Sequence, residues 1–384
     1  MNQPLIFLST CEFSGDMHGE VLINELRKIL PDARFYGLGG ERMASAGMEV
    51  LFDPTKRSTI GFVEVFKNLG KMTALIKEIS GEWEKRPPDI MIWLDSGGFN
   101  LKLAAEAQKR GIPVVCMFSP SAWGYWEERA VKLAERVKLL LAVLPFEADF
   151  YRKFGTNVKY IGHPLIDRVG ERDRGELRKR YGLMESQKLV ALMPGSRRQE
   201  IARLLPVMLE AAQDLNRELE IKWVLPLAAS IDRNWLESIA QEYQVPLEVI
   251  TSNVYDLLAA VDGAVISSGT ATLEAAILNT PMVVIYSVSK LSFFIYMRLR
   301  PKAQRGKRFL IALPNIIMGR EIVPELVQQD LSRAKITEHL RRILTDPRYN
   351  AELRRELQEV KAKIGPPGVM RRAAAEIAGM LRNG

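Results

Sequence analysis

The sequence predicts an α/β protein with two doubly wound parallel-sheet domains that face a cleft. Apolar runs of strand length alternate with amphipathic segments of helix length along most of the 384 residues, which is the pattern of parallel sheets covered by helices. A charge-dense stretch at residues 167–188 interrupts the alternation, which then restarts. Because ligands bind at the carboxyl ends of parallel strands, the cleft between the two domains is the expected binding site.

The expected strands fall into two groups. In the first half they are residues 5–9, 34–37, 90–94, 114–118, 139–143 and 158–161, and in the second half 189–193, 221–225, 247–250, 263–266 and 282–285. We therefore expect one domain at residues 1–166 and a second at residues 167–345. Residues 346–384 have helical periodicity with a break at 365–368, so we expect a tail of clasping helices.

Composition excludes several classes of protein. The chain is 47% apolar, as globular proteins are, and its two cysteines exclude a disulfide framework and a structural zinc site. The net charge of +8 indicates an anionic partner, which could be nucleic acid, a phosphorylated substrate or an anionic membrane face. The N-terminus lacks signal-peptide features, and the longest apolar run, residues 139–146, is too short to span a bilayer. A reducing, cytoplasmic environment is expected.

The most informative pattern is the turn at residues 267–274 in the second domain. It follows an apolar strand and opens a helix, so Ser268, Gly269 and Thr270 would present backbone N–H groups and hydroxyls to an anion at the positive end of the helix dipole. Glu274, one turn into the helix, could accept both hydroxyls of a ribose. The arrangement suits a nucleotide sugar, and an ordinary capped helix with a solvated Glu274 is the alternative.

A second phosphate ligand is expected after the strand at 189–193. Residues 194–196 form a loop whose glycine and serine would allow the backbone to approach a ligand closely, and Arg197 follows this loop at the start of a helix. A guanidinium makes bidentate, charge-assisted bonds to phosphate oxygens, so Arg197 is the expected diphosphate ligand, with a surface arginine as the alternative. Residues 313–321 form a further polar turn, and a helix is expected to begin near Glu321.

The first strand of the chain leads into a loop of small and acidic residues, 10–16, that could face a ligand. Its polar members include Glu12, Ser14 and Asp16, and a helix is expected from residue 17 to residue 30. The glycine spacing around Gly15 does not match a dinucleotide fingerprint. The alternative is a turn in which Asp16 caps the helix.

Asp95 follows the strand at 90–94, and the two glycines after Ser96 would expose its carboxylate. Partial burial would raise the pKa of this carboxyl from about 4, which would suit a general base that contributes roughly 10²–10⁴-fold to rate. A helix N-cap is the alternative. The next strand ends in an aromatic-rich loop, residues 118–126, that could stack on a sugar, pack against acyl chains or close off the core.

Eight short segments follow one another over more than 300 residues. They are Glu12-Phe13-Ser14-Gly15-Asp16, Ile60-Gly61-Phe62-Val63-Glu64-Val65, Pro88-Asp89 with Asp95 and Phe99-Asn100, Ser119-Pro120-Ser121-Ala122-Trp123, Gly162-His163-Pro164-Leu165, Pro194-Gly195-Ser196-Arg197, Ser268-Gly269-Thr270-Ala271-Thr272-Leu273-Glu274, and Leu313-Pro314-Asn315 with Gly319-Arg320-Glu321. Each segment alone is a weak signal. In this order they form a specific match, and the chain resembles the lipid-A-disaccharide synthase family over nearly its whole length.

The resemblance implies an inverting glycosyltransferase with two Rossmann-like domains in the architecture called GT-B. The first domain would bind the acceptor, 2,3-diacylglucosamine 1-phosphate, and the second the donor, UDP-2,3-diacylglucosamine. The products would be UDP and a β-1,6-linked disaccharide 1-phosphate, the lipid A disaccharide. The donor is a substrate, and neither a cofactor nor a metal is expected.

The resemblance also implies residue roles. Asp95 matches the family's essential aspartate and would take the proton from the attacking acceptor hydroxyl. Arg197 matches the essential arginine and would stabilise charge on the diphosphate. The other expected substrate-binding residues are Glu12, Ser14, Gly15, Asp16, Asn100, Ser119, His163, Ser268, Gly269, Thr270, Glu274, Asn315, Arg320 and Glu321.

Four positions depart from the family's pattern. Cys11 stands where the family usually has Gly, Gly98 where it has a second Asp, His18 where it has an apolar residue, and Tyr125-Trp126 near a usual Trp-Arg pair. Loss of the second Asp would leave Asp95 without a neighbour that could tune it. The departures lie in the first domain, so they bear on the identity of the acceptor.

Acyl chains on both substrates would hold the enzyme at the inner face of the cytoplasmic membrane as a peripheral protein. Two segments are candidates for the contact, each of which could equally be core: residues 65–79, an apolar face flanked by lysines, and residues 291–298, beside a basic cluster at 298–308. The resemblance suggests a homodimer. A nucleic-acid partner is not expected, because the basic residues are dispersed.

Two rival classes share part of the pattern. Another UDP-sugar enzyme, such as a different UDP-sugar transferase or a UDP-N-acetylglucosamine 2-epimerase, would keep the turn at 267–274 but would lack a lipid-binding aromatic surface. A non-catalytic protein that binds an anionic membrane surface would tolerate the loss of Asp95. Replacement of Asp95 therefore separates these classes.

Overall fold

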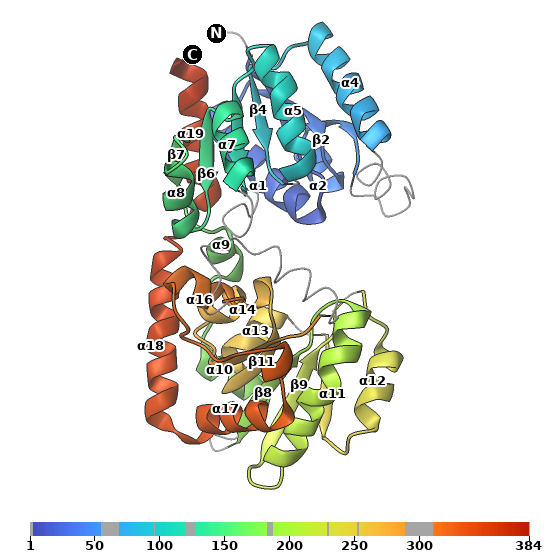
Figure 1. Cartoon of the computed structure of the whole chain (residues 1–384), viewed down its shortest axis with the longest axis vertical. Coiled ribbons are helices and arrows are strands. Elements are labelled where there is room, and N and C mark those ends of the chain that lie inside the picture. Colours follow the sequence, from blue (N-terminus) through green and yellow to red (C-terminus); the bar gives the residue numbers. More distant parts are fainter. Residues whose placement is uncertain are drawn as a thin grey trace. The chain divides into compact units, whose positions relative to one another are not determined.

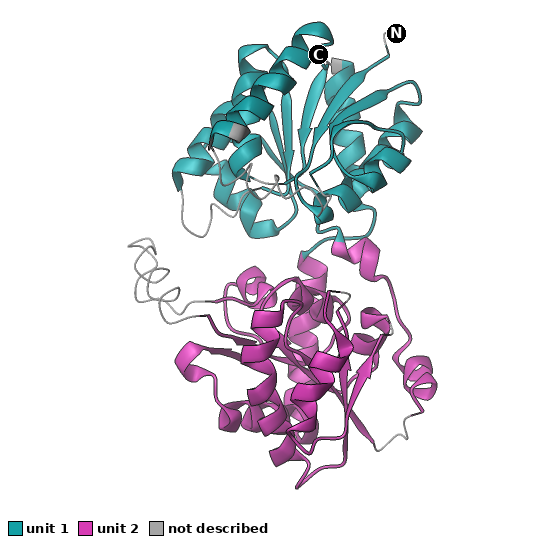
Figure 2. Ribbon diagram, turned by 90° about the vertical axis from the view of Figure 1, so that its right-hand side faces the viewer, with its two compact units in different colours: residues 1–164, 364–384 teal, residues 165–363 magenta. Residues whose placement is uncertain are grey.

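The computed structural model describes residues 3–54, 69–95, 97–119, 127–182, 187–228, 230–251, 253–288 and 310–383. The chain divides into two compact units (Figures 1 and 2): unit 1 is Met1–Pro164 with Ile364–Gly384, and unit 2 is Leu165–Lys363. Each unit contains one parallel sheet with helices packed on it. The expected class, α/β with two doubly wound domains, is confirmed.

Unit 1 contains a seven-stranded sheet in the order β3-β2-β1-β4-β5-β6-β7, in which all neighbouring strands are parallel. The strands are β1 (Leu5–Ser9), β2 (Arg34–Leu38), β3 (Glu49–Phe52), β4 (Ile90–Trp93), β5 (Val114–Met117), β6 (Leu139–Ala142) and β7 (Val158–Tyr160). The direction of winding changes between β1 and β4. Loops that follow these two strands therefore meet at the switch point, where such sheets bind ligands.

The helices of unit 1 are α1 (Phe13–Ile29), α2 (Glu41–Ser45), α4 (Leu69–Lys85), α5 (Gly97–Lys109), α7 (Glu127–Arg136), α8 (Pro145–Arg152) and α19 (Val369–Asn383). Helix α1 begins at Phe13, so the expectation of a loop as far as residue 16 is wrong. Strand β3 was not expected. It is an edge strand in which Glu49 and Leu51 are exposed, and it lacks the continuous apolar run of a buried strand.

Helix α4 bears on the expected membrane contact. Its residues Met72, Leu75 and Ile79 are buried in the core of unit 1 together with Trp83. The described part of the apolar face at 65–79 is therefore core, because its side chains are covered by the unit itself. Residues 65–68 and the second candidate, 291–298, lie outside the described residues, as do residues 120–126 of the aromatic loop.

Unit 2 contains a six-stranded sheet in the order β10-β9-β8-β11-β12-β13, again with parallel neighbours. The strands are β8 (Lys188–Met193), β9 (Ile221–Pro226), β10 (Leu247–Ile250), β11 (Gly263–Ser267), β12 (Met282–Tyr286) and β13 (Glu325–Val327). The winding changes direction between β8 and β11. The loops after these strands are the ones that carry Arg197 and Ser268.

The helices of unit 2 are α9 (Leu165–Val169), α10 (Arg174–Arg180), α11 (Arg198–Leu215), α12 (Arg233–Gln241), α13 (Val254–Ala260), α14 (Thr270–Ile277), α16 (Leu313–Met318), α17 (Arg333–Thr345) and α18 (Pro347–Lys363), with a short 3₁₀ turn at Gln328–Asp330. The helix expected near Glu321 is wrong. Helix α16 ends at Met318, Gly319 caps it with φ 69°, and β13 follows at Glu325.

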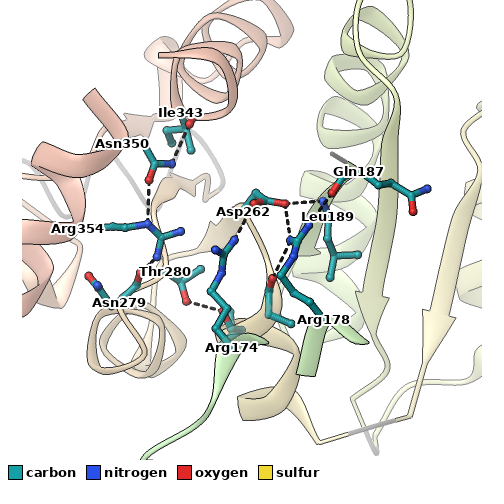
Figure 3. Close-up of polar contacts among 12 residues, drawn as sticks. Arg174, Arg178, Gln187, Leu189, Asp262, Asn279, Thr280, Ile343, Asn350 and Arg354 are labelled. Carbon is teal, nitrogen blue, oxygen red and sulfur yellow. Dashed lines mark hydrogen bonds and ion pairs between the residues drawn. The ribbon is translucent and has the colours of Figure 1, made fainter. Parts of the chain in front are cut away.

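Asp262 joins helix α10, which lies in the charge-dense stretch at 167–188, to the sheet of unit 2 (Figure 3). Its carboxylate pairs with Arg174 at 2.7 Å and with Arg178 at 2.9 Å, and it accepts the Leu189 amide at 2.9 Å. Arg178 also donates to the Gln187 carbonyl oxygen at 2.8 Å. Helix α10 is therefore held at the amino end of β8 and β11, opposite the edge that carries Arg197 and Ser268.

The C-terminal tail is shared between the units. Helix α18 packs against α14, α16 and α17, whereas α19 packs along α1. The Ile364 carbonyl oxygen accepts the His163 amide at 2.9 Å, and Arg372 donates to the Ile161 carbonyl oxygen at 2.9 Å. The two units thus divide the chain differently from the expected domains, 1–166 and 167–345, with a tail at 346–384. Of the helices in the described ranges, none combines the length and the apolar character that a bilayer span requires.

Candidate active site

The carboxylate of Asp95 lies against the start of helix α1. Its Oδ1 accepts the Cys11 amide at 2.7 Å, and its Oδ2 accepts the Glu12 amide at 3.0 Å and the Thr10 hydroxyl. The residue is 9% exposed. Burial raises the pKa of Asp95 to about 6, and the three hydrogen bonds act in the opposite direction because they favour the carboxylate. This is the geometry expected of loops that meet at the switch point of the sheet.

Gly15 lies where α1 passes closest to this carboxylate. A Cβ atom at Gly15 would overlap both the Thr10 hydroxyl oxygen and Oδ2 of Asp95. The close approach of helix and carboxylate therefore requires glycine here. Gly98, in the first turn of α5, would place its Cβ in open space.

Two buried side chains donate hydrogen bonds to the backbone of Asp95. Its carbonyl oxygen accepts the Trp93 indole N–H at 2.6 Å and the side-chain amide of Asn100. Asn100 is fully buried, and its Oδ1 finds no hydrogen-bond partner among the described residues. Asn100 therefore supports the backbone of Asp95 and is not accessible at the surface.

The other residues of the first loop divide into exposed and buried members. Glu12 and Ser14 are exposed at the start of α1. Asp16 is 2% exposed, and its carboxylate accepts the amides of Gly40 at 2.7 Å, Arg42 at 3.2 Å and Met43 at 3.2 Å. Asp16 caps α2 and not its own helix, so its oxygens serve the fold.

Ser119 and His163 lie in two further loops of unit 1. The Ser119 hydroxyl is buried without a hydrogen-bond partner among the described residues. Burial and, to a smaller extent, the charge of the neighbouring His18 together lower the pKa of His163 to about 4. The His18 ring stacks on Phe118 with ring centroids 4.5 Å apart, and Phe118 has a φ of 59°, a left-handed conformation that is uncommon for a bulky residue.

In unit 2, β11 runs into the turn that opens helix α14. Gly269 and Thr270 are exposed, so the first backbone N–H groups of the helix face solvent. The Ser268 hydroxyl donates to the Ile311 carbonyl oxygen at 3.0 Å and anchors the turn. Glu274, one turn farther on, is partly buried, and its Oε1 accepts the Tyr255 hydroxyl at 3.2 Å. Burial raises the pKa of Glu274.

Arg197 stands at the N-cap position of α11, directly after the loop that follows β8. Its side chain is 81% exposed and pairs with the Glu200 carboxylate at 2.8 Å. The next residue, Arg198, makes a cation–π contact instead, because its guanidinium lies 4.5 Å from the centre of the Trp235 ring. Arg197 is thus a cation at the surface of the β8–β11 switch point.

The three expected residues at 315–321 make hydrogen bonds or ion pairs within unit 2. Asn315 is fully buried, and its side chain bonds to the backbone of Ile322 and Val323 and, at 2.7 Å, to Glu325. Arg320 pairs with Glu356 at 2.5 Å, and the Glu321 carboxylate accepts the Glu325 amide at 3.2 Å. Buried Asn315 therefore supports the fold, and a substrate contact by Arg320 or Glu321 stays a prediction.

Sequence reasoning missed Thr10, Tyr255 and Glu325 as parts of the site. Glu325 is buried, and its carboxylate accepts the amides of Ile311 and Ala312, which supports the segment that anchors Ser268. Their partners lie 10 to 85 positions away in the sequence, so periodicity carries no signal for these contacts. Within the described ranges, no three His, Cys, Asp or Glu side chains gather as a metal ion needs.

Known proteins resemble this chain in sequence and in fold. A family model described as lipid-A-disaccharide synthetase matches residues 6–374. The lipid-A-disaccharide synthase of Nitrosococcus oceani is 38% identical over 380 residues, which cover 98% of this chain and 96% of that protein. The synthase of Myxococcus xanthus is 35% identical and covers 100% of this chain and 99% of its own length.

Solved structures support the fold alone. The calicheamicin glycosyltransferase CalG4 has a TM-score of 0.64 at 15% identity and covers 100% of this chain and 99% of its own. A UDP-GlcNAc 2-epimerase from Neisseria meningitidis, solved with UDP-GlcNAc, has a TM-score of 0.63 at 12% identity and covers 100% of both chains. Two Rossmann-like units of the GT-B type are thus shown, and from its sequence the chain belongs to the lipid-A-disaccharide synthetase family.

Proposed function

We propose that the protein is an inverting glycosyltransferase that makes the lipid A disaccharide. It transfers 2,3-diacylglucosamine from UDP to the 6-hydroxyl of 2,3-diacylglucosamine 1-phosphate, and it releases UDP. Membership of the family supports this reaction. One observation supports the location of the donor site: Arg197 and the Ser268–Thr270 turn follow the two central strands of unit 2, which are neighbours in the sheet.

Unit 2 would bind the donor. The exposed N–H groups at Gly269 and Thr270 and the guanidinium of Arg197 would hold the diphosphate, and the Glu274 carboxylate would accept the ribose hydroxyls. Charge develops on the diphosphate as the sugar leaves, and these preorganised donors stabilise it. The phosphate would replace Glu200 as the partner of Arg197, since the exposed ion pair between them is weak.

Unit 1 would bind the acceptor, with Asp95 as general base. Its Oδ1 accepts one hydrogen bond from a described residue, which leaves a second lone pair for the attacking hydroxyl. The pKa of about 6 keeps the group ionised at neutral pH and basic enough to take a proton. One displacement on the face opposite UDP inverts the anomeric centre. Exposed Glu12 and Ser14 are the polar first-loop side chains open to the acceptor.

The acylated substrates place the reaction at a membrane surface. We propose that the enzyme is peripheral at the inner face of the cytoplasmic membrane and that it acts as a homodimer. The net charge of +8 favours an anionic surface. Met72, Leu75 and Ile79 are buried in the core of unit 1, so these three side chains do not take part in the contact.

Mass spectrometry of the products tests the proposal. The enzyme is incubated with UDP-2,3-diacylglucosamine and 2,3-diacylglucosamine 1-phosphate, and the expected products are UDP and a disaccharide 1-phosphate. Asp95→Asn should stay folded and lose at least roughly 10²-fold in turnover. An epimerised donor, hydrolysis without a disaccharide, or full turnover by Asp95→Asn would contradict the respective part of the proposal.

A further inference from the structure

Tyr255 meets Glu274 from a separate element of unit 2. It is the second residue of helix α13, and its amide bonds to the N-cap residue Asn253 at 2.9 Å. The side chain is buried, with 8% exposed, and its hydroxyl lies 3.2 Å from Oε1 of Glu274. The guanidinium of Arg168, from α9, lies over the ring with Cζ 5.9 Å from its centre.

In this hydrogen bond the Tyr255 hydroxyl is the donor and the Glu274 carboxylate is the acceptor. Burial, with the charge of Glu274, raises the pKa of Tyr255 to about 12, so the phenol keeps its proton and donates it to the carboxylate. Burial also raises the pKa of Glu274, whereas the hydrogen bond from the Tyr255 hydroxyl and the charge of Arg168 lower it. These are the charged and titratable groups that face Glu274 among the described residues.

A carboxylate has two oxygens, and Tyr255 engages one of them. Oε2 of Glu274 accepts no hydrogen bond from a described residue, so it is free for a ligand. A single bond to a buried phenol sets the plane of the carboxylate and hence the direction in which Oε2 points. The ring of Tyr255 is held by its own burial and by Arg168, which keeps this donor in place.

We propose that Tyr255 is a positioning residue for the ribose of a uridine diphosphate: by holding Oε1 of Glu274, it aims Oε2 at the 2′- and 3′-hydroxyls. The inference rests on the proposed function, which places the donor nucleotide at Glu274. Tyr255 itself need not touch the nucleotide. Its hydroxyl acts through Glu274, whereas its ring serves the core of the unit.

Tyr255→Phe removes the hydroxyl and keeps the ring. The affinity for UDP should fall about 10-fold, the effect of one hydrogen bond to a charged group. The affinity for 2′,3′-dideoxyuridine diphosphate, which lacks both hydroxyls, should change less than about 2-fold. With the donor sugar, KM should rise and kcat should stay close to that of the wild type.

Titration calorimetry of the full-length protein with UDP and with the dideoxy analogue tests the proposal. The matched control is Tyr349→Phe, since Tyr349 also lies beneath an arginine, with Cζ of Arg342 3.9 Å from its ring centre. Glu274→Gln is the reference for a lost ribose contact. The expected result is that Tyr255→Phe and Glu274→Gln both reduce the preference for UDP over the analogue, and that Tyr349→Phe does not.

Two results would overturn the inference in distinguishable ways. If Glu274→Gln reduces the preference for UDP but Tyr255→Phe keeps it, or weakens both ligands alike, then Tyr255 serves only the fold. If the wild type binds both ligands equally, or if Glu274→Gln keeps the preference, then the ribose does not lie at Glu274. The second outcome removes the nucleotide site of the proposed function as well.

Discussion

Replacement of Gly15 by alanine probes the contact between helix α1 and Asp95. Alanine in place of glycine in a helix normally stabilises by roughly 0.5–1 kcal/mol. At Gly15, however, the new Cβ would overlap the Thr10 hydroxyl oxygen and Oδ2 of Asp95, two of the atoms that join β1, α1 and β4. The sign of the effect should therefore reverse.

The magnitude follows from the contacts that must change. Overpacking in a filled interior costs about 1–3 kcal/mol. The hydrogen bond from Thr10 to the charged carboxylate must also lengthen or break, which costs about 1.5–3 kcal/mol. After the gain in helix propensity, Gly15→Ala should lower the free energy of unfolding of unit 1 by about 2–5 kcal/mol.

Urea denaturation read by hydrogen exchange of peptides from unit 1 measures this change, because the two units need not unfold together. Gly98→Ala is the matched control, since its Cβ meets open space in the first turn of α5, and it should be neutral or stabilising. Gly15→Ala should also slow turnover, because Asp95 must move. A Gly15→Ala protein as stable and as active as the wild type would refute the reasoning about this contact.

Three further predictions concern charge. Since the pKa of Asp95 is raised to about 6, the base is active when ionised, and kcat/KM should rise with pH through about 6; a profile that is flat between pH 5 and 7 would argue against Asp95 as base. Arg197→Ala should reduce kcat roughly 10²–10³-fold, whereas Arg198→Ala, which loses a contact with Trp235, should stay within about 3-fold in the same assay; equal effects would remove Arg197 from the diphosphate site. Asp262→Asn should lower the stability of unit 2 by about 3 kcal/mol in urea denaturation, because Arg178 is left without a counter-charge, and a neutral result would show that the cluster is not needed.

Much of the fold was predictable because buried parallel strands are short, continuous apolar runs. The expected bounds of the strands at 5–9 and 247–250 match those of the structure, and the other expected strands each differ by one residue. Strands β3 and β13 were missed. The first alternates between exposed and partly buried residues, and in the second Pro324 and Glu325 interrupt the apolar residues, so neither produces that pattern.

The site was predictable as far as it depends on strand ends. Asp95 meets the first loop, and Arg197 and Ser268 follow neighbouring strands, because carboxyl ends of parallel strands share one edge of the sheet. The roles of Asp16 and Asn315 were not predictable from the sequence. A polar residue that binds a ligand and one that caps a distant helix or fills a buried network have the same local sequence, and only the tertiary partners of the side chain distinguish them.

Hydrogen-exchange mass spectrometry of the whole protein with and without UDP tests the central claim most directly. The account predicts protection on UDP binding in peptides that cover residues 194–200 and 267–274, with smaller protection at the start of α13 through Tyr255 and Glu274. Protection confined to unit 1, or absent from both of these peptides while UDP binds, would contradict it.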